Sequence, residues 1–288
     1  MPDTERITLS TLRARKRDRR PITVLTAYDY TFASILDAAG IDCVLVGDSA
    51  SQVILGHPST LPITLDFLLT LTAAVRRGAP RCFLIGDMPF LSYQVNPEEA
   101  VRNAGRFMAE AGCDCVKVEC DARLVGTVER IASASIPVMV HLGLRPQAVY
   151  QVGGYKAQAR TAESAQSLIA EARMMEQSGA SALLLEAVPA EPARIITEST
   201  TLPVIGCGAG GHCDGQVVVL HDMLGLSDGP LPKFVKQYAK TRYDISEAIR
   251  AYVAEVVERR YPGPEHTYDM SQGQETRLHG PKAARSEP

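Results

Sequence analysis

The sequence lacks long hydrophobic runs and has no large excess of charge of one sign. None of its 288 residues lies in an apolar stretch of the about 18 residues that a membrane-spanning helix needs. The N-terminus has no apolar core of the kind found in signal peptides, which predicts a cytoplasmic protein. With 30 Lys and Arg against 33 Asp and Glu, the charge gives no reason to expect nucleic acid or a membrane as a partner and favours small-molecule ligands.

Paired cysteine motifs are also missing. The seven cysteines do not form CxxC pairs, and Cys113, Cys115 and Cys120 surround an apolar segment. This pattern predicts reduced, buried thiols. A soft-metal ligand is the alternative for Cys115, but a small apolar residue within a strand is the favoured interpretation.

The apolar content, 45% of the chain, is sufficient for a full core without disulfides. Short apolar runs rich in β-branched residues alternate with helical patterns, which indicates βα units and a parallel sheet covered on both faces. Eight such runs predict an α/β protein with a single-domain (β/α)8 TIM barrel. The predicted strands are Ile22–Thr26, Cys43–Asp48, Cys82–Asp87, Cys115–Glu119, Pro137–His141, Ala182–Glu186, Pro203–Gly206 and Val217–Leu220.

Amphipathic segments between these runs predict helices, with prolines at two starts and glycines after several ends. The starting prolines are Pro97 and Pro192. The predicted helices are Asp66–Arg77, Pro97–Ala111, Ala122–Ser133, Ser164–Ser178 and Pro192–Ser199, and the glycines expected to end helices are Gly40, Gly78, Gly112 and Gly179.

Three regions are expected along the chain: a helical arm at 1–21, the catalytic barrel at 22–262 and a polar, flexible tail at 263–288. The arm holds six basic residues, Arg13, Arg15, Lys16, Arg17, Arg19 and Arg20. A solvated helical face explains this run better than a basic arm or a transit peptide, because acidic residues interrupt it. Near the end of the barrel, 225–240 has a loop-like composition, and a final helix is expected near Ile245–Arg259.

Polar residues follow the apolar parts of five consecutive predicted strands, where barrel active sites lie. They are Asp48 and Ser49, Asp87, Lys117 and Glu119, His141, and Glu186. Because residues two apart in a strand point to the same side, Lys117 and Glu119 should both face the barrel axis.

Three of these residues, Asp48, Asp87 and Glu119, are carboxylates whose mutual repulsion calls for a cation. Oxygen ligands favour Mg2+, with Mn2+ as the alternative. Each carboxylate could instead cap the helix that follows its strand.

The remaining polar residues have two interpretations each. Lys117 could hold a substrate carboxylate or form a Schiff base, or it could form an ion pair with Glu119 or Asp87. His141 could donate a hydrogen bond to the substrate or serve a structural role. Glu186 lies among apolar residues that favour a general base, and a buried structural pair is the alternative.

Two glycine-rich segments are less specific. Gly206, Gly208, Gly210 and Gly211 follow the seventh strand and could bind phosphate or form a tight turn, but they lack a dinucleotide fingerprint. The segment GGYKAQAR at 153–160 could close as a lid or form a mobile loop.

A series of motifs, in the same order as in the family, resembles ketopantoate hydroxymethyltransferases from about Ile22 to His266. They are TAYDY at Thr26, VGDS at Val46, STLPIT at Ser59, AAVRRGAP at Ala73, GDMPF at Gly86, VKVE at Val116, HLGLRPQ at His141, GGYKAQAR at Gly153, LEAVP at Leu185, IGCGAG at Ile205 and DGQVVVLHDMLG at Asp214. A match spread over so much of the chain is far more specific than one short motif.

The resemblance implies a TIM barrel that transfers a hydroxymethyl group from 5,10-methylenetetrahydrofolate to 3-methyl-2-oxobutanoate, giving 2-dehydropantoate for pantothenate and coenzyme A synthesis. It also implies a cytoplasmic homo-oligomer, commonly a decamer. By resemblance, Asp48, Asp87 and Glu119 hold Mg2+, and Glu186 accepts a proton. The oxo acid would contact Asp48, Ser49, Asp87, Lys117 and His141.

Two other functions are compatible with a barrel and a metal site. The first is another Mg2+-dependent 2-oxo acid lyase of the phosphoenolpyruvate type. The second is a barrel that binds a metabolite without turnover, which the set of ionisable residues at the strand ends argues against.

Overall fold

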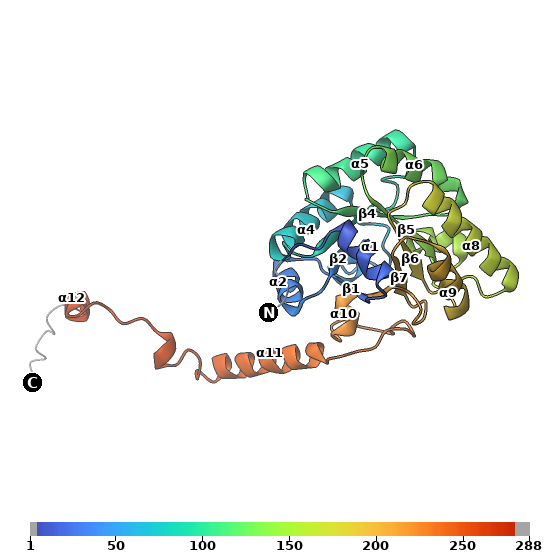
Figure 1. Ribbon diagram of the computed structural model, residues 1–288. Helices are drawn as coiled ribbons and strands as arrows, with labels where there is room; N and C mark the ends of the chain where they lie inside the picture. Colours follow the sequence, from blue (N-terminus) through green and yellow to red (C-terminus); the bar gives the residue numbers. More distant parts are fainter. Residues whose placement is uncertain (1–4, 280–288) are drawn as a thin grey trace, which may run out of the picture. The chain divides into compact units, whose positions relative to one another are not determined.

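The computed structural model describes residues 5–279, and the chain divides into two compact units, Met1–Ala239 and Lys240–Pro288. In the first unit, eight parallel strands pair in chain order and close into a barrel (Figure 1). They are β1 (Ile22–Thr26), β2 (Cys43–Val46), β3 (Phe83–Asp87), β4 (Cys115–Glu119), β5 (Val138–Gly143), β6 (Ala182–Glu186), β7 (Val204–Cys207) and β8 (Gly215–Val218). The predicted fold class is confirmed.

The predicted limits of three strands, β1, β4 and β6, match the structure. The others differ by one or two residues at either end, and two of the differences affect the interpretation. The second strand ends at Val46, so Asp48 and Ser49 lie in the turn after it rather than in the strand. The eighth strand begins at Gly215, earlier than the predicted Val217.

Helices cover the outside of the barrel, and all five predicted helices exist with shifted ends. Those of the first unit are α1 (Leu9–Arg17), α2 (Tyr30–Ala39), α3 (Ala50–Val53), α4 (Leu65–Gly78), α5 (Pro97–Ala109), η1 (Ala122–Leu124), α6 (Val125–Ser133), η2 (Pro146–Ala148), α7 (Val149–Val152), α8 (Ala162–Gln177), α9 (Ala190–Ser199) and α10 (Leu220–Met223). Pro97 opens α5 as predicted, whereas α9 begins before Pro192, at Ala190.

Of the glycines expected to end helices, Gly40 lies at the cap of its helix and Gly78 lies within its helix. Gly40 caps α2 in the left-handed conformation, with a φ of 86°, which a glycine adopts without the penalty of a Cβ. Gly78 is the last residue of α4, and a Cβ on it would lie 2.4 Å from the carbonyl oxygen of Tyr30. This glycine therefore permits close packing of α4 against α2 instead of a left-handed turn.

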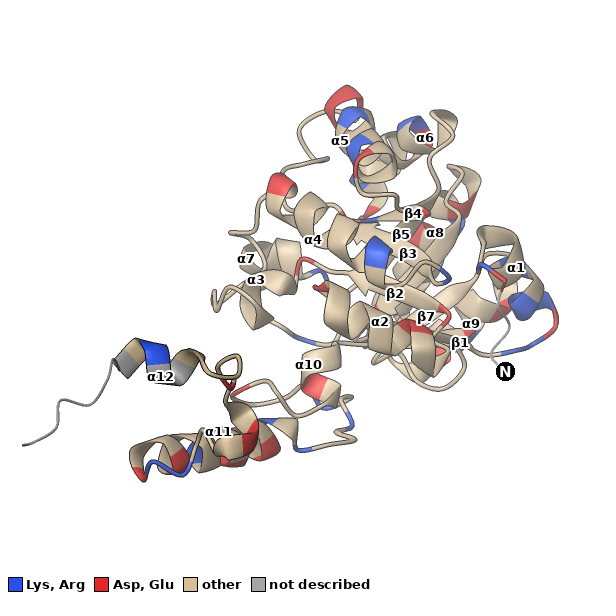
Figure 2. Cartoon of the chain, turned by 90° about the vertical axis from the view of Figure 1, so that its left-hand side faces the viewer, with Lys and Arg blue, Asp and Glu red and all other residues tan. Residues whose placement is uncertain are grey.

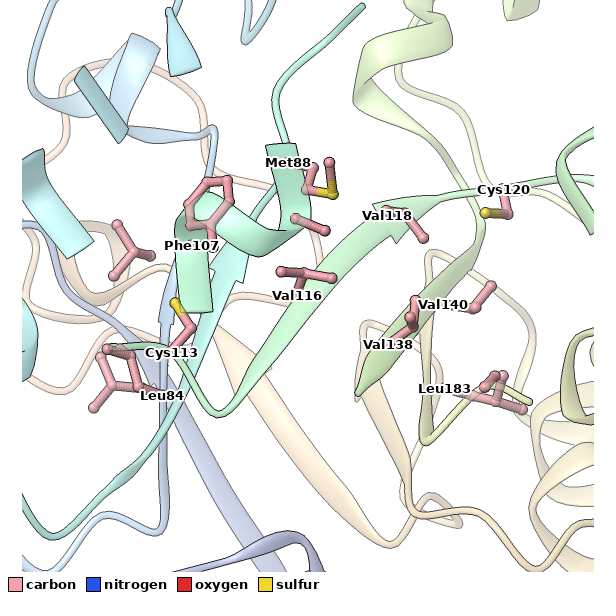
Figure 3. Packing of buried hydrophobic residues seen from close by; sticks show 14 of the residues in the cluster. Leu84, Met88, Phe107, Cys113, Val116, Val118, Cys120, Val138, Val140 and Leu183 are labelled. Carbon is pink, nitrogen blue, oxygen red and sulfur yellow. The ribbon is translucent and has the colours of Figure 1, made fainter. Parts of the chain in front are cut away.

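Alternation along the strands creates two apolar layers. Inward-facing residues such as Phe83, Cys115 and Leu184 fill the barrel. Outward-facing residues such as Val116 and Val138 pack beneath the helices, and Figure 3 shows several of them around Phe107 of α5. Because Cys115 faces inward, Lys117 and Glu119 on the same strand do so as well.

The N-terminal helix α1 packs on the end of the barrel opposite the strand carboxyl ends, since its buried Leu12 joins the interior cluster (Figure 1). Its basic residues appear in blue in Figure 2. Lys16 Nζ lies 2.7 Å from Asp214 Oδ2, and Arg15 Nη1 lies 2.6 Å from Asp42 Oδ2. The prediction of a helix is confirmed, but the prediction of a solvated face is wrong for Arg15 and Lys16, which anchor the helix.

The second unit contains α11 (Thr241–Val257), η3 (Pro264–His266) and α12 (Gln274–His279). The helix predicted near Ile245–Arg259 is α11, which begins four residues earlier, and it is not the final helix, since α12 follows it. The segment 225–240 contains no helix or strand, as its composition indicates. No residue of α11 is buried. The predicted tail falls partly on η3 and α12, and its residues 280–288 lie outside the described part of the chain. None of the helices within 5–279 is long and apolar enough to span a membrane.

Candidate active site

The polar residues predicted for the site come from adjacent strands at one end of the barrel. Asp48 and Ser49 occupy the turn after β2, Asp87 ends β3, Lys117 and Glu119 lie on β4, His141 lies on β5, and Glu186 ends β6. The strand register pairs Asp87 with Lys117 and Glu119 with His141. The barrel therefore brings together side chains that are far apart in the sequence.

Lys117 is the centre of this group. Its Nζ lies 2.7 Å from Asp87 Oδ1, 4.0 Å from Glu119 Oε1 and 3.3 Å from His141 Nδ1. Burial opposes its charge, but the carboxylates of Asp87, Glu119 and Asp48 outweigh burial and raise the pKa of its ammonium group. Lys117 is therefore a cation, which argues against the neutral amine that a Schiff base requires. The ion pair with Asp87, one of the predicted alternatives, is present.

His141 connects Lys117 to Glu186. Burial and the nearby charge of Lys117 lower the pKa of His141 well below its usual range, so its ring is neutral. The Lys117 ammonium can only donate, which makes Nδ1 of His141 the acceptor and leaves the ring hydrogen on Nε2. That Nε2 lies 3.5 Å from Glu186 Oε2. The geometry thus places an N–H donor next to the carboxyl group of Glu186.

Burial raises the pKa of the three carboxyl groups that face this centre. The pKa of Asp87 rises to about 7 and that of Glu186 to about 8, while the pKa of Glu119 rises well above its usual range. In each case the positive charge of Lys117 offsets only part of the cost of burial. A further cation would favour the ionised forms.

Two of these carboxylates have one oxygen held by the backbone. Asp87 Oδ2 accepts a hydrogen bond from the Asp48 N–H at 2.9 Å, and Glu119 Oε2 accepts one from the Gln147 N–H at 2.9 Å. Within the described residues, the buried Oε1 of Glu119 has no hydrogen-bond donor. None of the three predicted ligands caps the helix that follows its strand, because the N-cap residues there are Ser49 for α3, Asn96 for α5 and Asp121 for η1. The capping alternative is therefore wrong.

The side chains at this site decide whether it can hold Mg2+. Across the described range 5–279, no three His, Cys, Asp or Glu side chains lie close enough together to hold a metal ion. The ammonium group of Lys117 instead lies against Asp87. The donor chemistry nevertheless fits a hard cation, since all three carboxylates are buried and Glu119 Oε1 has no hydrogen-bond donor among the described residues.

Three neutral side chains around the site were missed by the sequence reasoning. Tyr28 Oη lies 2.8 Å from Ser49 Oγ. Gln147 donates from Nε2 to Asp48 Oδ2 at 3.0 Å, and Tyr93 Oη donates to Gln147 Oε1 at 2.7 Å. Tyr28 and Gln147 lie within the motifs TAYDY and HLGLRPQ, and this position could have indicated their part in the site. They were missed because the site residues were chosen among ionisable side chains and their immediate neighbours.

The two glycine-rich segments differ in their relation to the site. Gly208 and Gly210 have positive φ values of 71° and 82°, as a tight turn requires. In the segment 153–160, burial and the charges of Asp48 and Glu119 raise the pKa of Tyr155, which is half-exposed. The Gln158 N–H donates to the Ala187 carbonyl oxygen at 2.9 Å, next to Glu186. This segment therefore borders the carboxylate group.

All seven cysteines are free thiols. Cys115 is buried and its Sγ contacts the carbonyl oxygen of Val116, which agrees with a small apolar residue in a strand. Burial raises its pKa above the usual range, so its thiol is not prepared to ligate a metal. Five cysteines are buried and two, Cys207 and Cys213, are partly exposed.

Comparisons with known proteins give a consistent result. Residues 6–264 match the family model described as ketopantoate hydroxymethyltransferase. The chain is 49% identical over 270 residues to the 3-methyl-2-oxobutanoate hydroxymethyltransferase of Anaeromyxobacter sp. (strain Fw109-5), covering 92% of this chain and 88% of that one. It is 46% identical over 267 residues to the enzyme of the same name from Syntrophomonas wolfei subsp. wolfei, covering 93% and 97%.

Among solved structures, the chain is similar to a phosphonopyruvate hydrolase in complex with oxalate and Mg2+. The TM-score is 0.59, with 94% and 95% of the two chains covered and 13% sequence identity, so this likeness shows the shared barrel fold alone. The family model, in contrast, matches most of the chain, and the two relatives match most of it at 46% and 49% identity. The chain belongs to the ketopantoate hydroxymethyltransferase family.

Proposed function

We propose that this chain transfers a hydroxymethyl group from 5,10-methylenetetrahydrofolate to 3-methyl-2-oxobutanoate, giving 2-dehydropantoate. The observation that carries the proposal is the partly buried carboxyl group of Glu186, which lies next to a neutral imidazole. Desolvation raises its pKa to about 8, although the positive charge of Lys117 lowers it. The names of the relatives support the same reaction. The folate donor is supported by the family resemblance rather than by any residue contact.

Glu186 is the proposed general base. A carboxylate whose pKa is raised to about 8 is a stronger proton acceptor than an ordinary glutamate, and it suits the removal of a weakly acidic hydrogen. The proton to be removed is on C3 of 3-methyl-2-oxobutanoate, next to the oxo group. The resulting enolate would form a carbon–carbon bond to the methylene carbon, while both bonds from that carbon to folate nitrogens break. One water would supply the hydroxyl oxygen of the product. Tetrahydrofolate would leave with the second proton of that water and the proton taken from C3.

The oxo acid would be bound by the side chains around Lys117. The Lys117 ammonium is a fixed positive charge for the substrate carboxylate or the oxo oxygen. Ser49, whose hydroxyl is held by Tyr28, would donate a hydrogen bond, and Asp48, Asp87 and His141 would line the same position. In this arrangement, the substrate would bind between the ammonium group of Lys117 and the carboxylate of Glu186.

We also propose that Asp48, Asp87 and Glu119 hold Mg2+. When bound, Mg2+ would supply Lewis-acid polarisation of the substrate oxo group. The support is the oxygen-only donor set and the burial of all three carboxylates. A phosphonopyruvate hydrolase of the same fold has been solved in complex with oxalate and Mg2+.

The assembly is proposed to be a homo-oligomer, a decamer by resemblance, in the cytoplasm. Helix α11 supports self-association because it carries several exposed large apolar side chains. They are Tyr243, Ile245, Ile249, Tyr252, Val253, Val256 and Val257. Such a concentration of apolar surface on one helix is typical of an interface.

The test of the proposed function is proton NMR of 3-methyl-2-oxobutanoate in D2O, with and without Mg2+. The C3 proton should exchange with deuterium only when the folded protein and Mg2+ are both present. Glu186→Gln should abolish the exchange while Mg2+ binding persists. Exchange that survives in Glu186→Gln would remove Glu186 from the role of base, and no exchange with wild-type protein would favour the lyase alternative or chemistry that requires folate.

A further inference from the structure

We propose that Gln147 is a positioning residue that sets the orientation of two site carboxylates, Asp48 through its side chain and Glu119 through its backbone. The proposal deepens the proposed function, since it rests on these carboxylates forming the metal and substrate site. Gln147 belongs to η2, in the connection after β5. It thus links that connection to carboxylates that follow β2 and end β4.

The side-chain amide of Gln147 has every hydrogen-bonding position filled. Nε2 donates to Asp48 Oδ2 and to the Met88 carbonyl oxygen, both at 3.0 Å. Oε1 accepts from Tyr93 Oη at 2.7 Å and from Gln94 Nε2 at 3.0 Å. An amide with two donated and two accepted bonds has no freedom to rotate without losing some of them.

The direction of the amide is also determined. The Met88 carbonyl can only accept, so the atom of Gln147 that faces it must be the nitrogen. Tyr93 Oη accepts from the Glu119 N–H at 3.0 Å, and its own hydrogen has two acceptors, Gln147 Oε1 at 2.7 Å and the Glu119 carbonyl oxygen at 3.2 Å, of which Gln147 is the nearer. The nitrogen of Gln147 is therefore aimed at Asp48, and reversing the amide would place two oxygens against each other.

The backbone of Gln147 acts on the second carboxylate. Its N–H donates to Glu119 Oε2 at 2.9 Å, whereas Oε1 of the same group lies 3.8 Å from His141 Nδ1 and 4.0 Å from Lys117 Nζ. One oxygen of Glu119 is thus held at the periphery, and the other is turned toward the centre of the site.

Gln147 is suited to this role because it is neutral. It is buried, with 6% of its surface exposed, beside carboxylates that already repel one another. An arginine or lysine there would compete with a bound cation for the same oxygens, while an acidic residue would add repulsion. An amide orients the carboxylate without neutralising it, which leaves its charge for the cation.

The test compares the wild-type protein with Gln147→Met and Tyr93→Phe. Methionine has a similar length but no donor, so Asp48 Oδ2 loses its partner while the backbone bond to Glu119 remains. Tyr93→Phe keeps the Gln147 amide but removes the hydroxyl that orients it, and it serves if Gln147→Met fails to fold. Gln216→Met is the control, because among the described residues Gln216 Nε2 donates to the Gly210 carbonyl oxygen, away from the site.

Mg2+ affinity is measured by titration calorimetry and melting temperature is measured without Mg2+. We expect the Mg2+ dissociation constant to rise about 10- to 100-fold in Gln147→Met and less in Tyr93→Phe, with the control unchanged. A melting temperature that falls while Mg2+ affinity stays within about twofold of wild type would show a merely structural role and overturn the proposal.

Crystal structures of the same proteins separate this proposal from the proposed function. If wild-type protein binds no Mg2+, the proposed metal site fails, but the positioning role is still decided by the carboxylate of Asp48. A displacement beyond about 0.5 Å in Gln147→Met supports the role of Gln147. An unmoved Asp48 carboxylate overturns it.

Discussion

Nε2 of His141 lies 3.5 Å from Oε2 of Glu186, and Nδ1 of the same ring lies 3.3 Å from Nζ of Lys117. The imidazole of His141 therefore lies between the charged Lys117 of β4 and Glu186 of β6, the proposed base. Because Lys117 donates to Nδ1, the neutral ring presents its hydrogen to Glu186. Although this Nε2 makes no hydrogen bond among the described residues, an N–H dipole directed at Glu186 would favour its ionised form, which is the form that accepts a proton.

The first prediction concerns the pH dependence of proton removal. Burial raises the pKa of Glu186 to about 8, and only its ionised form is a base, so C3 exchange should increase with pH and level off above about 8. The rate should change about tenfold per pH unit well below that value. The measurement is the initial rate of deuterium exchange at several pH values. If the exchange rate changes by less than about tenfold between pH 6 and pH 9, Glu186 is not the base.

The second prediction concerns His141. In His141→Leu, Glu186 loses the N–H that favours its ionised form, so the midpoint of the pH–rate profile should move to higher pH. The rate at neutral pH should fall about 10- to 100-fold. His212→Leu is the matched control, since His212 is exposed on the loop after β7, and its profile should equal that of the wild type. A lower rate with an unmoved midpoint would indicate that His141 acts on the substrate instead.

The third prediction concerns the cost of the base to stability. The pKa of Glu186 rises from 4.5 to about 8 on folding, so between these values the folded state holds a proton that the unfolded state has lost. Stability contributed by the protonated group is complete below the lower value and is lost as pH rises through the higher one. Glu186→Gln should therefore melt several degrees higher than wild type at pH 9, which corresponds to a free energy of unfolding larger by on the order of 1–2 kcal/mol.

At pH 4 the same two proteins should melt at nearly the same temperature, on the order of one degree apart. Glu129→Gln provides the control, because Glu129 is an exposed residue of α6. Differential scanning calorimetry at both pH values gives the comparison. Equal stabilisation of Glu186→Gln at the two pH values would show that the effect is not due to ionisation of Glu186.

The fourth prediction concerns the anchor at the opposite end of the barrel. Lys16→Met leaves Asp214 without its cation, although Asp214 Oδ2 still accepts from the Val204 N–H. The free energy of unfolding should fall by about 2 kcal/mol, with C3 exchange unchanged at a temperature where the variant is folded. Arg17→Met, which breaks an exposed pair with Asp18, should cost less than about 0.5 kcal/mol. Loss of exchange activity in folded Lys16→Met would contradict the separation of the two ends.

The fifth prediction concerns assembly. Val253→Glu places a charge among the exposed apolar side chains of α11, and burying that charge at an interface would be costly. Light scattering should show a smaller assembly than for wild-type protein. Ala251→Glu, on an exposed position of the same helix outside this apolar group, should leave the assembly unchanged. A wild-type chain that is monomeric at micromolar concentration would contradict the proposed homo-oligomer.

The sequence by itself determined the strands and most of the charged site. The apolar runs and the residues that follow them depend on local periodicity, because a strand exposes alternate residues to opposite sides whatever its neighbours are. This is why Lys117 and Glu119 were correctly predicted to face inward. The wrong end of the second strand also has a local cause. The predicted strand ran to Asp48, but β2 ends at Val46, and no residue between them marks the point where the strand becomes a turn.

Only the tertiary structure decided which polar groups pair with which. Lys117 could have paired with Asp87 or Glu119, and the strand register sets Lys117 directly beside Asp87. Gln147 and Tyr93 are 54 residues apart in the chain, and nothing in the local pattern around either one indicates that they share a hydrogen bond. Such contacts depend on barrel closure, which brings distant segments together after the local structure has been specified, and neutral side chains carry no charge pattern that would reveal them.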